Sequence, residues 1–406
     1  MGRRRGCGAI VAFRQQMERP MQVNDLSRSL VAFDQNSTLV AVVELSLKSW
    51  LVAGLVPGLT RQPLKRSPPD GEALAALLDR WRSEAVKSGR RIERVAVAFE
   101  AGRDGFWLAR VLRARGIEAY VIHPTSIPVP REHRRAKTDR LDTGLLMRAF
   151  LGWLRGEAKH CSMAPIPSLA EEDAKRPNRE HEKLGAERTR ILNKIKAALV
   201  RLGVRGFKPN LRNAAERLEA LRTPEGLPVP PNTLAELRRD LGRLKLVREQ
   251  IKEIERARER RLKQAPQEGA HPMVLMLARL KSLGVETADR LVHEAFYRSL
   301  RDRRAVTRYG GMTGAPDESG AKRREKGLAR AGNGRVRKAM LQLAYRWIMF
   351  QKESALTQWY QRRVAGAKGD VRKTMIIALA RKLLIALWRY VTEGEVPAGA
   401  VLRPAP

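Results

Sequence analysis

The most informative segment of the chain is Leu39-Val40-Ala41-Val42-Val43-Glu44, a continuous apolar run that ends in a carboxylate. Runs of this length and β-branched character are typical of strands buried on both faces of a sheet. A second such run, residues 95–99, ends at Glu100, and residues 119–122 form a third. Because stretches with helical spacing separate these runs, residues 37–158 are predicted to form an α/β domain with a mixed sheet.

The rest of the chain is predicted to be helical. Apolar residues step by three and four through residues 234–254, which indicates a coiled-coil seam within a helical region at 180–264. The partner of that seam is either the helix predicted at 180–201 or a second copy of the chain. Residues 272–395 are interpreted as a helical domain interrupted by a glycine-rich segment at 310–334.

Charge narrows the class of partner. The 406 residues include 80 Lys and Arg but only 43 Asp and Glu, so the formal net charge is +37. Such an excess attracts the phosphate backbone of nucleic acids through counterion release. The two cysteines, Cys7 and Cys161, exclude a disulfide framework and a cysteine-based zinc site. No apolar run reaches the roughly 20 residues that a membrane-spanning helix needs. Residues 1–36 are interpreted as a mobile arm or as sequence upstream of a start at Met21.

Four carboxylates are placed where they can converge. Glu44 and Glu100 each end a predicted strand, and Asp139 and Asp142 are three residues apart on one face of a predicted helix. Carboxylate oxygens of this kind bind Mg²⁺, and two such ions can hold the attacking and leaving oxygens of a phosphodiester. Each residue also has a plain structural reading, such as Asp139 as a helix N-cap. Three basic residues that precede the aspartates are predicted to contact a nucleic-acid backbone: Arg134, Arg135 and Lys137.

A serine lies in the glycine-rich segment. Ser319 is followed, from residue 322 to residue 338, by eight Lys or Arg and a single acid. Positive charge favours attack by a hydroxyl on phosphorus and stabilises the crowded transition state. The alternative is a flexible basic loop with an incidental serine. Asn333 is predicted to cap the helix that follows, and these residues are predicted to bind nucleic acid: Lys322, Arg323, Arg324, Asn333, Arg335 and Arg337.

In this order, the motifs resemble the DEDD transposases of the insertion sequence 110 family, from about Val40 to Val391. The most specific pieces are Arg135-Ala136-Lys137-Thr138-Asp139-Arg140-Leu141-Asp142, Phe99-Glu100-Ala101-Gly102, and Ser319-Gly320 followed by Gly332-Asn333 and Arg337. The resemblance implies a RuvC-like (ribonuclease H fold) domain, a coiled coil and a helical C-terminal transposase domain.

The resemblance also implies a reaction. Mg²⁺ on the four carboxylates would act at the scissile phosphate, and Ser319 would attack DNA to form a covalent phosphoserine intermediate. A structured bridge RNA would guide the enzyme by pairing with donor and target DNA. The active assembly would be a homo-oligomer, a dimer or tetramer, in the bacterial cytoplasm at the nucleoid.

One residue departs from the family pattern, which has Asp where this chain has Glu44. A glutamate supplies the same carboxylate on a longer side chain, so we expect Glu44 to remain a ligand, with an impaired copy as the alternative. Two further alternatives stay open for the whole protein. It could be a RuvC-like metal-dependent nuclease in which water is the nucleophile, or a decayed transposase that binds nucleic acid without cutting it.

Overall fold

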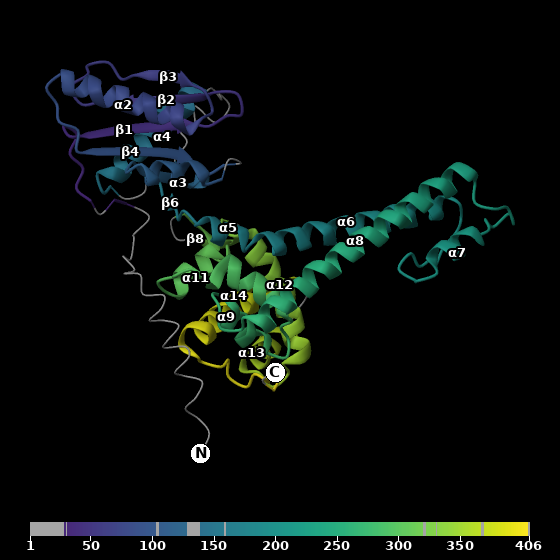
Figure 1. Ribbon diagram of the computed structural model, residues 1–406. Helices are drawn as coiled ribbons and strands as arrows, with labels where there is room; N and C mark the ends of the chain where they lie inside the picture. Colours follow the sequence, from purple (N-terminus) through teal and green to yellow (C-terminus); the bar gives the residue numbers. More distant parts are fainter. Residues whose placement is uncertain are drawn as a thin grey trace. The chain divides into compact units, whose positions relative to one another are not determined.

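The computed structural model describes residues 28–29, 31–102, 105–127, 139–157, 160–319, 322–329, 331–366 and 369–404. These residues belong to two compact units, one ending at Ala170 and the other beginning at Glu171 (Figure 1). Most of the predicted arm at 1–36 lies outside the described residues. Within the described part of the chain, no helix has the length and apolar character needed to cross a membrane.

The first unit is built on a six-stranded mixed sheet with strand order β3-β2-β1-β4-β5-β6. β4 runs parallel to β1 and to β5, whereas the pairs β1–β2, β2–β3 and β5–β6 are antiparallel. The strands are β1 (Thr38–Glu44), β2 (Trp50–Leu55), β3 (Leu64–Ser67), β4 (Arg94–Glu100), β5 (Glu118–Ile122) and β6 (Met163–Ala164). The predicted α/β class and mixed sheet are therefore confirmed.

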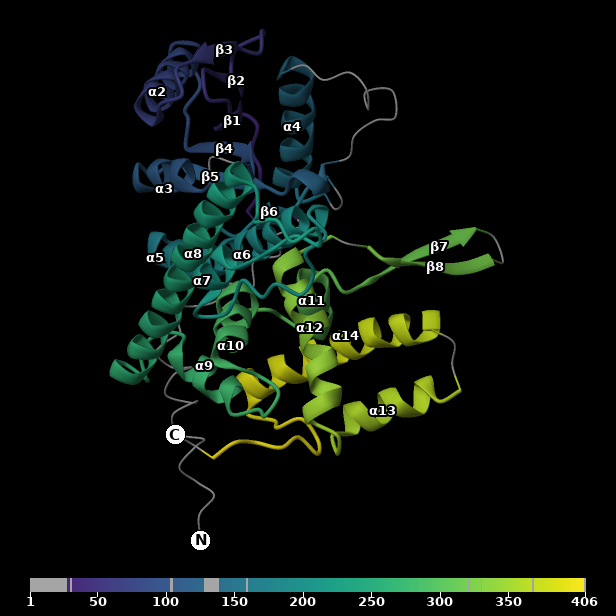
Figure 2. The ribbon, with the colours of Figure 1, turned by 90° about the vertical axis from the view of Figure 1, so that its right-hand side faces the viewer.

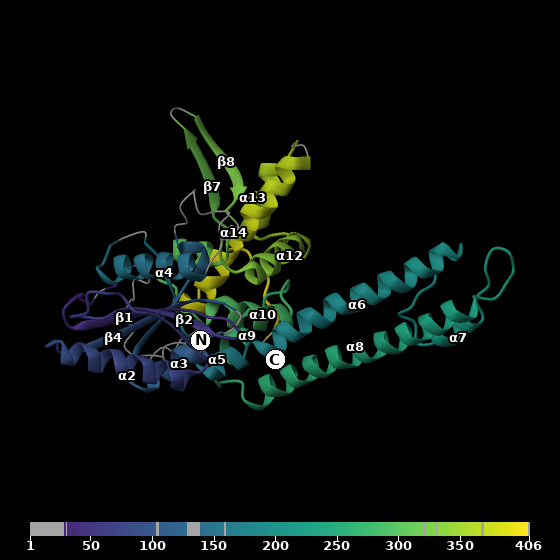
Figure 3. The ribbon, with the colours of Figure 1, turned by 90° about the horizontal axis from the view of Figure 1, so that it is seen from above.

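Helices cover both faces of this sheet (Figure 3). α2 (Gly71–Lys87) and α3 (Trp107–Ala114) pack on one face, and α4 (Asp139–Leu154) packs on the other. A short 3₁₀ turn, η1 (Pro124–Ser126), follows β5. Because β1 and β4 are central and covered on both sides, nearly all of their residues are buried, which explains their continuous apolar sequence.

The second unit begins with a helical hairpin. α6 (Arg176–Arg201) and α8 (Pro231–Gln264) pack side by side along a core that includes Ile195, Leu199 and Leu244 (Figure 1). The seam predicted at 234–254 therefore has a partner within the chain, namely α6. The connector between them contains α7 (Ala214–Glu219), and α5 (Leu169–Asp173) precedes them.

The remaining helices form a compact body around a second large core, in which Trp347 and Leu383 are fully buried. They are α9 (His271–Ala278), α10 (Val285–Leu291), the π-helical turn η3 (Val292–Phe296), α11 (Arg303–Tyr309), α12 (Gly334–Phe350), α13 (Ala355–Val364) and α14 (Gly369–Glu393). The helices predicted for this region are thus present.

Two segments contain strands that the sequence patterns do not indicate. The segment 63–71 includes β3, an edge strand that pairs with β2. The glycine-rich segment 310–334 contains β7 (Gly314–Ser319) and β8 (Lys322–Leu328), which form an antiparallel hairpin. Figure 2 shows this hairpin extending away from α11, α12 and α14.

Candidate active site

Two of the predicted carboxylates lie next to each other at one edge of the sheet. β1 and β4 are parallel neighbours, and their register aligns Val43 with Phe99. Glu44 and Glu100 are the next residues along each strand, where both strands end. Both side chains are half-buried. The register therefore places the two glutamates at neighbouring positions on the carboxyl edge of the sheet.

The two glutamates also share a face of the sheet. Four residues of β1 and β4 belong to the core beneath α4: Val40, Val42, Ala96 and Ala98. Because side chains alternate along a strand, Glu44 and Glu100 lie on this same face. Asp139 and Asp142 are in the first turn of α4, the helix that covers it. Asp142 is half-buried, and the side chain of Asp139 is outside the described part of the structure.

The magnesium site predicted from the sequence stays a prediction. Among the described side chains, no three His, Cys, Asp or Glu residues are close enough to hold a metal ion together. Asp142 thus does not complete a trio with Glu44 and Glu100. Two adjacent carboxylates still fit Mg²⁺, because this ion keeps several water ligands and often binds through one or two carboxylates.

Ser319 occupies a different environment, in the second unit. It is the last residue of β7, it is exposed, and the register of the hairpin sets it opposite Lys322. Lys322, Arg323 and Arg324 all belong to β8, whose backbone is described but whose side chains here are not. The hairpin thus presents a hydroxyl on an extended arm beside a basic segment.

The base of this hairpin is fixed to the helical body by tight backbone contacts. The amide of Ala329 donates to the carbonyl of Thr313 at 3.0 Å, and the amide of Asn333 donates to the carbonyl of Tyr309 at 2.6 Å. Gly332 has φ +100°, and a Cβ there would lie 2.6 Å from the carbonyl oxygens of Arg308 and Tyr309. Only glycine satisfies both conditions without strain.

Asn333 connects the hairpin to two helices. As the predicted N-cap of α12, its side-chain oxygen accepts from the amides of Arg335 and Val336. Its amide group donates to Glu294 Oε2 at 3.0 Å and to the Tyr309 hydroxyl oxygen at 3.3 Å. The N-cap prediction is confirmed.

Glu294 is the buried centre of this connection. Its carboxylate accepts a hydrogen bond from Arg179 Nε of α6 at 3.0 Å as well as from Asn333. Burial acts to raise the pKa of Glu294, but the bonds from Arg179 and Asn333 outweigh burial and hold that pKa below its ordinary value. A line of charged and polar contacts therefore runs from the base of α6 to the base of the serine hairpin.

The other residues predicted to bind nucleic acid differ in how exposed they are. Arg335 is exposed and pairs with Glu182 at 3.3 Å. Arg337 is half-buried, and its Nη1 donates to the Gly311 carbonyl at 3.4 Å, so it helps to hold the hairpin base. Their contacts with nucleic acid stay predictions. Three further residues lie outside the described range: Arg134, Arg135 and Lys137.

Arg179, Glu294 and Tyr309 were not singled out by the sequence. Glu294 is separated by 115 residues from Arg179 and by 39 from Asn333. No motif spacing links residues so far apart. The only available signal was the prediction of Asn333 as an N-cap, which left its amide group without an assigned partner.

We expect Gly332→Ala to lower the free energy of unfolding of the second unit by about 1–3 kcal/mol, because alanine is strained at this φ and would press on two carbonyl oxygens. Urea denaturation followed by circular dichroism measures the change. Gly334→Ala is the matched control, since its φ is not in the left-handed region and a Cβ there meets only Arg337 Nη2 at 3.6 Å. Equal effects of the two substitutions would contradict this reading of Gly332.

We expect the hairpin base to lose stability in acid. A carboxyl whose pKa is lower in the folded state stabilises the fold above its unfolded-state pKa, and this contribution is lost as the pH falls through the folded pKa. For Glu294 the loss therefore lies below its ordinary value of 4.5. The free energy of unfolding of the wild type should fall more steeply between about pH 5 and pH 3 than that of Glu294→Gln. If the free energy of unfolding fell with pH at the same slope in the wild type and in Glu294→Gln, the carboxyl of Glu294 would not be held ionised by its neighbours.

Sequence comparisons place this arrangement in a known group. The sequence model of the group described as "Transposase IS116/IS110/IS902 family" matches residues 275–361, which include Ser319 and Asn333. The chain is also 40% identical over 374 residues to "Putative transposase y4rJ" of Sinorhizobium fredii (strain NBRC 101917 / NGR234). That alignment covers 89% of this chain and 93% of the relative, so it spans most of both units. With the serine hairpin inside the matched segment and the likeness extending along most of the chain, the protein belongs to the IS116/IS110/IS902 transposase family.

Proposed function

We propose that this transposase is a recombinase that cuts and rejoins DNA strands with Ser319 as the nucleophile. The observation that carries the proposal is the placement of Ser319, which is exposed at the end of β7 and opposite Lys322 in register. The anchored base formed by Gly332 and Asn333 supports it, because a nucleophile must be held in a defined direction.

The proposed chemical step is a transesterification. Ser319 Oγ loses its proton and forms a bond to phosphorus, while the bond from phosphorus to the leaving deoxyribose oxygen breaks. The leaving oxygen takes up a proton, and the DNA strand becomes attached to the serine. Attack by a second strand's hydroxyl on this phosphoserine reverses the step and joins the new partners, so no external energy source is required.

The carboxylates would hold Mg²⁺ beside the DNA. We assign Glu44 and Glu100 as ligands on the sheet edge, with Asp139 and Asp142 of the covering helix as the remaining candidates. When bound, Mg²⁺ would withdraw charge from the phosphodiester oxygens. A mixed sheet with helices on both faces and paired acids at its carboxyl edge supports a RuvC-like assignment for the first unit.

The partners are proposed on chemistry and family membership. Donor and target DNA suit a chain with a net charge of +37, as does a structured bridge RNA that selects them. The carboxylates and Ser319 lie in separate units, which supports an assembly in which several protomers contribute. We therefore also propose that the active form is a dimer or tetramer.

The experiment that tests this function is a gel assay. Full-length protein, Mg²⁺, RNA transcribed from beside its gene and labelled matching DNA are mixed and quenched in detergent. A protease-sensitive protein–DNA adduct supports the serine recombinase. Cleavage without an adduct supports a metal-dependent nuclease with water as nucleophile. Binding without strand breakage supports a decayed transposase and overturns both enzymatic readings.

We expect Glu100→Gln to reduce Mg²⁺-dependent strand cleavage by about a hundredfold or more, because an amide is a weaker ligand than a carboxylate. Glu44→Asp should keep substantial activity, since it preserves the carboxylate. Glu118→Gln is the control, because Glu118 on neighbouring β5 pairs with Arg94 away from the carboxyl edge. Cleavage by Glu100→Gln at the wild-type rate would remove Glu100 from the metal site.

A further inference from the structure

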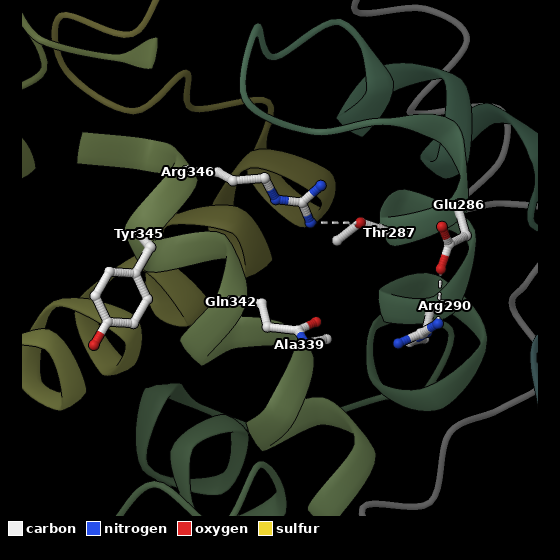
Figure 4. A pocket seen from close by; sticks show the side chains of 7 residues that line it. All are labelled: Glu286, Thr287, Arg290, Ala339, Gln342, Tyr345 and Arg346. Atoms are coloured by element: carbon white, nitrogen blue, oxygen red, sulfur yellow. Dashed lines mark hydrogen bonds and ion pairs between the residues drawn. The ribbon is translucent and has the colours of Figure 1, made fainter. Parts of the chain in front are cut away.

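A pocket separate from the hairpin lies between α10 and α12 (Figure 4). It has a volume of about 420 Å³, and neither Ser319 nor any of the four carboxylates contributes to it. The residues that line it are Glu286, Thr287 and Arg290 of α10, and Ala339, Gln342, Tyr345 and Arg346 of α12. Both helices belong to the second unit, so the pocket is formed within one body.

Two arginines give the pocket a net positive charge. Arg290 Nη2 pairs with Glu286 Oε1 at 2.7 Å, and Arg346 Nη2 donates to Thr287 Oγ1 at 2.9 Å (Figure 4). Each of these contacts holds its guanidinium in place. Glu286 is the one acid among the lining residues. Arginine presents several N–H groups in a fixed plane, which suits the oxygens of a phosphate.

The side of the pocket formed by α12 adds an aromatic ring and an amide. Tyr345 has 58% of its surface exposed, and Gln342 is also exposed. A tyrosine ring can stack on any nucleobase, whichever base is present. An amide both donates and accepts hydrogen bonds, as does the edge of a base. Figure 4 shows the Tyr345 ring turned away from α10, so the ring lies at the outer rim of the pocket, with Gln342 and Arg346 beside it on α12. A base on the ring would therefore have its phosphate near Arg346.

The exposed face of α12 links this pocket to the serine hairpin. α12 begins next to Asn333, and four exposed positions follow one another on one side of the helix: Arg335, Lys338, Gln342 and Tyr345. Helix rise separates the first from the last by about 15 Å. No acidic residue occurs in α12. Arg335 and Lys338 both pair with Glu182 of α6, so a strand passing the hairpin base would meet one excess positive charge and then the pocket.

We propose that this pocket binds a single unstacked nucleotide, with its base on Tyr345 and its phosphate at Arg346. The proposal rests on the proposed function to the extent that a polynucleotide reaches the hairpin. It adds a site for a base that has left the helical stack, on the helix that begins at the base of the serine hairpin. Extruding a base costs least where it is already unpaired, so a bulged nucleotide is the preferred ligand.

The test compares two duplexes that differ only in one bulged 2-aminopurine. Full-length protein is titrated by fluorescence anisotropy in EDTA, so the measurement is independent of any cleavage chemistry. We expect the wild type to bind the bulged duplex about tenfold more tightly than the paired one, with quenching of the 2-aminopurine by stacking. Tyr345→Ala should remove both the preference and the quenching, whereas Tyr345→Phe should keep them.

Met349→Ala is the matched control, since Met349 is 63% exposed on the same helix but does not line the pocket. A second arm uses RNA hairpins with and without the bulge, and the stronger preference identifies which nucleic acid supplies the nucleotide. Equal affinity of the wild type for bulged and paired forms of both nucleic acids overturns the proposal. So does a Tyr345→Ala variant that changes only the oligomeric state in sedimentation, since this would mark a protein interface. A bulge preference without any serine adduct would retain the pocket and reject the proposed function.

Discussion

Ser319→Ala is expected to reduce strand exchange by at least about a thousandfold, because the variant has no atom that can form the bond to phosphorus. Its affinity for DNA and RNA should remain close to that of the wild type. The serine is exposed, so the substitution removes one hydroxyl without opening a cavity in either core. Strand exchange is measured on labelled DNA, and affinity is measured by anisotropy.

Ser299→Ala is the control for this prediction, because Ser299 is another exposed serine of the second unit. It should exchange strands at the wild-type rate. Recombination by Ser319→Ala at more than a small fraction of that rate would show that another group is the nucleophile. A large loss of affinity in Ser319→Ala would instead point to misfolding.

Arg258→Ala is expected to destabilise the second unit by about 3–5 kcal/mol, because it leaves the buried carboxylate of Asp289 without its arginine partner. Arg258 Nε contacts Asp289 Oδ2 at 3.1 Å, and Arg258 Nη2 donates to Asn178 Oδ1 at 3.0 Å. Asn178 in turn donates to Asp289 at 2.7 Å. These buried residues join α6, α8 and α10, so the loss should appear in urea denaturation as a lower midpoint.

The exposed Arg260 of the same helix provides the control, and Arg260→Ala should change stability by less than about 0.5 kcal/mol. The double variant Arg258→Met with Asp289→Asn should recover part of the loss, because neither buried charge then remains unpaired. The losses of unfolding free energy caused by Arg258→Met and by Asp289→Asn are measured separately and added. A double variant that loses as much as this sum would show that the two charges do not act as a pair.

The central strands could be predicted from the sequence because strands buried on both faces need apolar residues at nearly every position. Every residue of β1 from Thr38 to Val43 is buried, and residues 39–43 are accordingly all apolar. The parallel register then places Glu44 beside Glu100 without any further information. Edge strand β3 has no apolar run in its sequence, because three of its four residues are exposed.

The hairpin could not be predicted because its sequence also suits a loop. β7 and β8 pair with each other through their backbones, and their glycines and charged residues show no alternating apolar face. The heptad pattern of α8 identified a seam but not its partner, since α6 and a second copy offer the same apolar surface. The buried contacts of Asp289 were likewise invisible, because Asn178 is 111 residues away in the sequence.

The most direct test of the account is to determine which residue carries the DNA. The detergent-resistant adduct formed by the full-length protein is digested with nuclease and protease, and the nucleotide-bearing peptide is sequenced by mass spectrometry. Attack by Ser319 would give one modified peptide, with the nucleotide phosphate on Ser319. A nucleotide attached to another side chain, or strand exchange with no modified peptide, would contradict this role of Ser319.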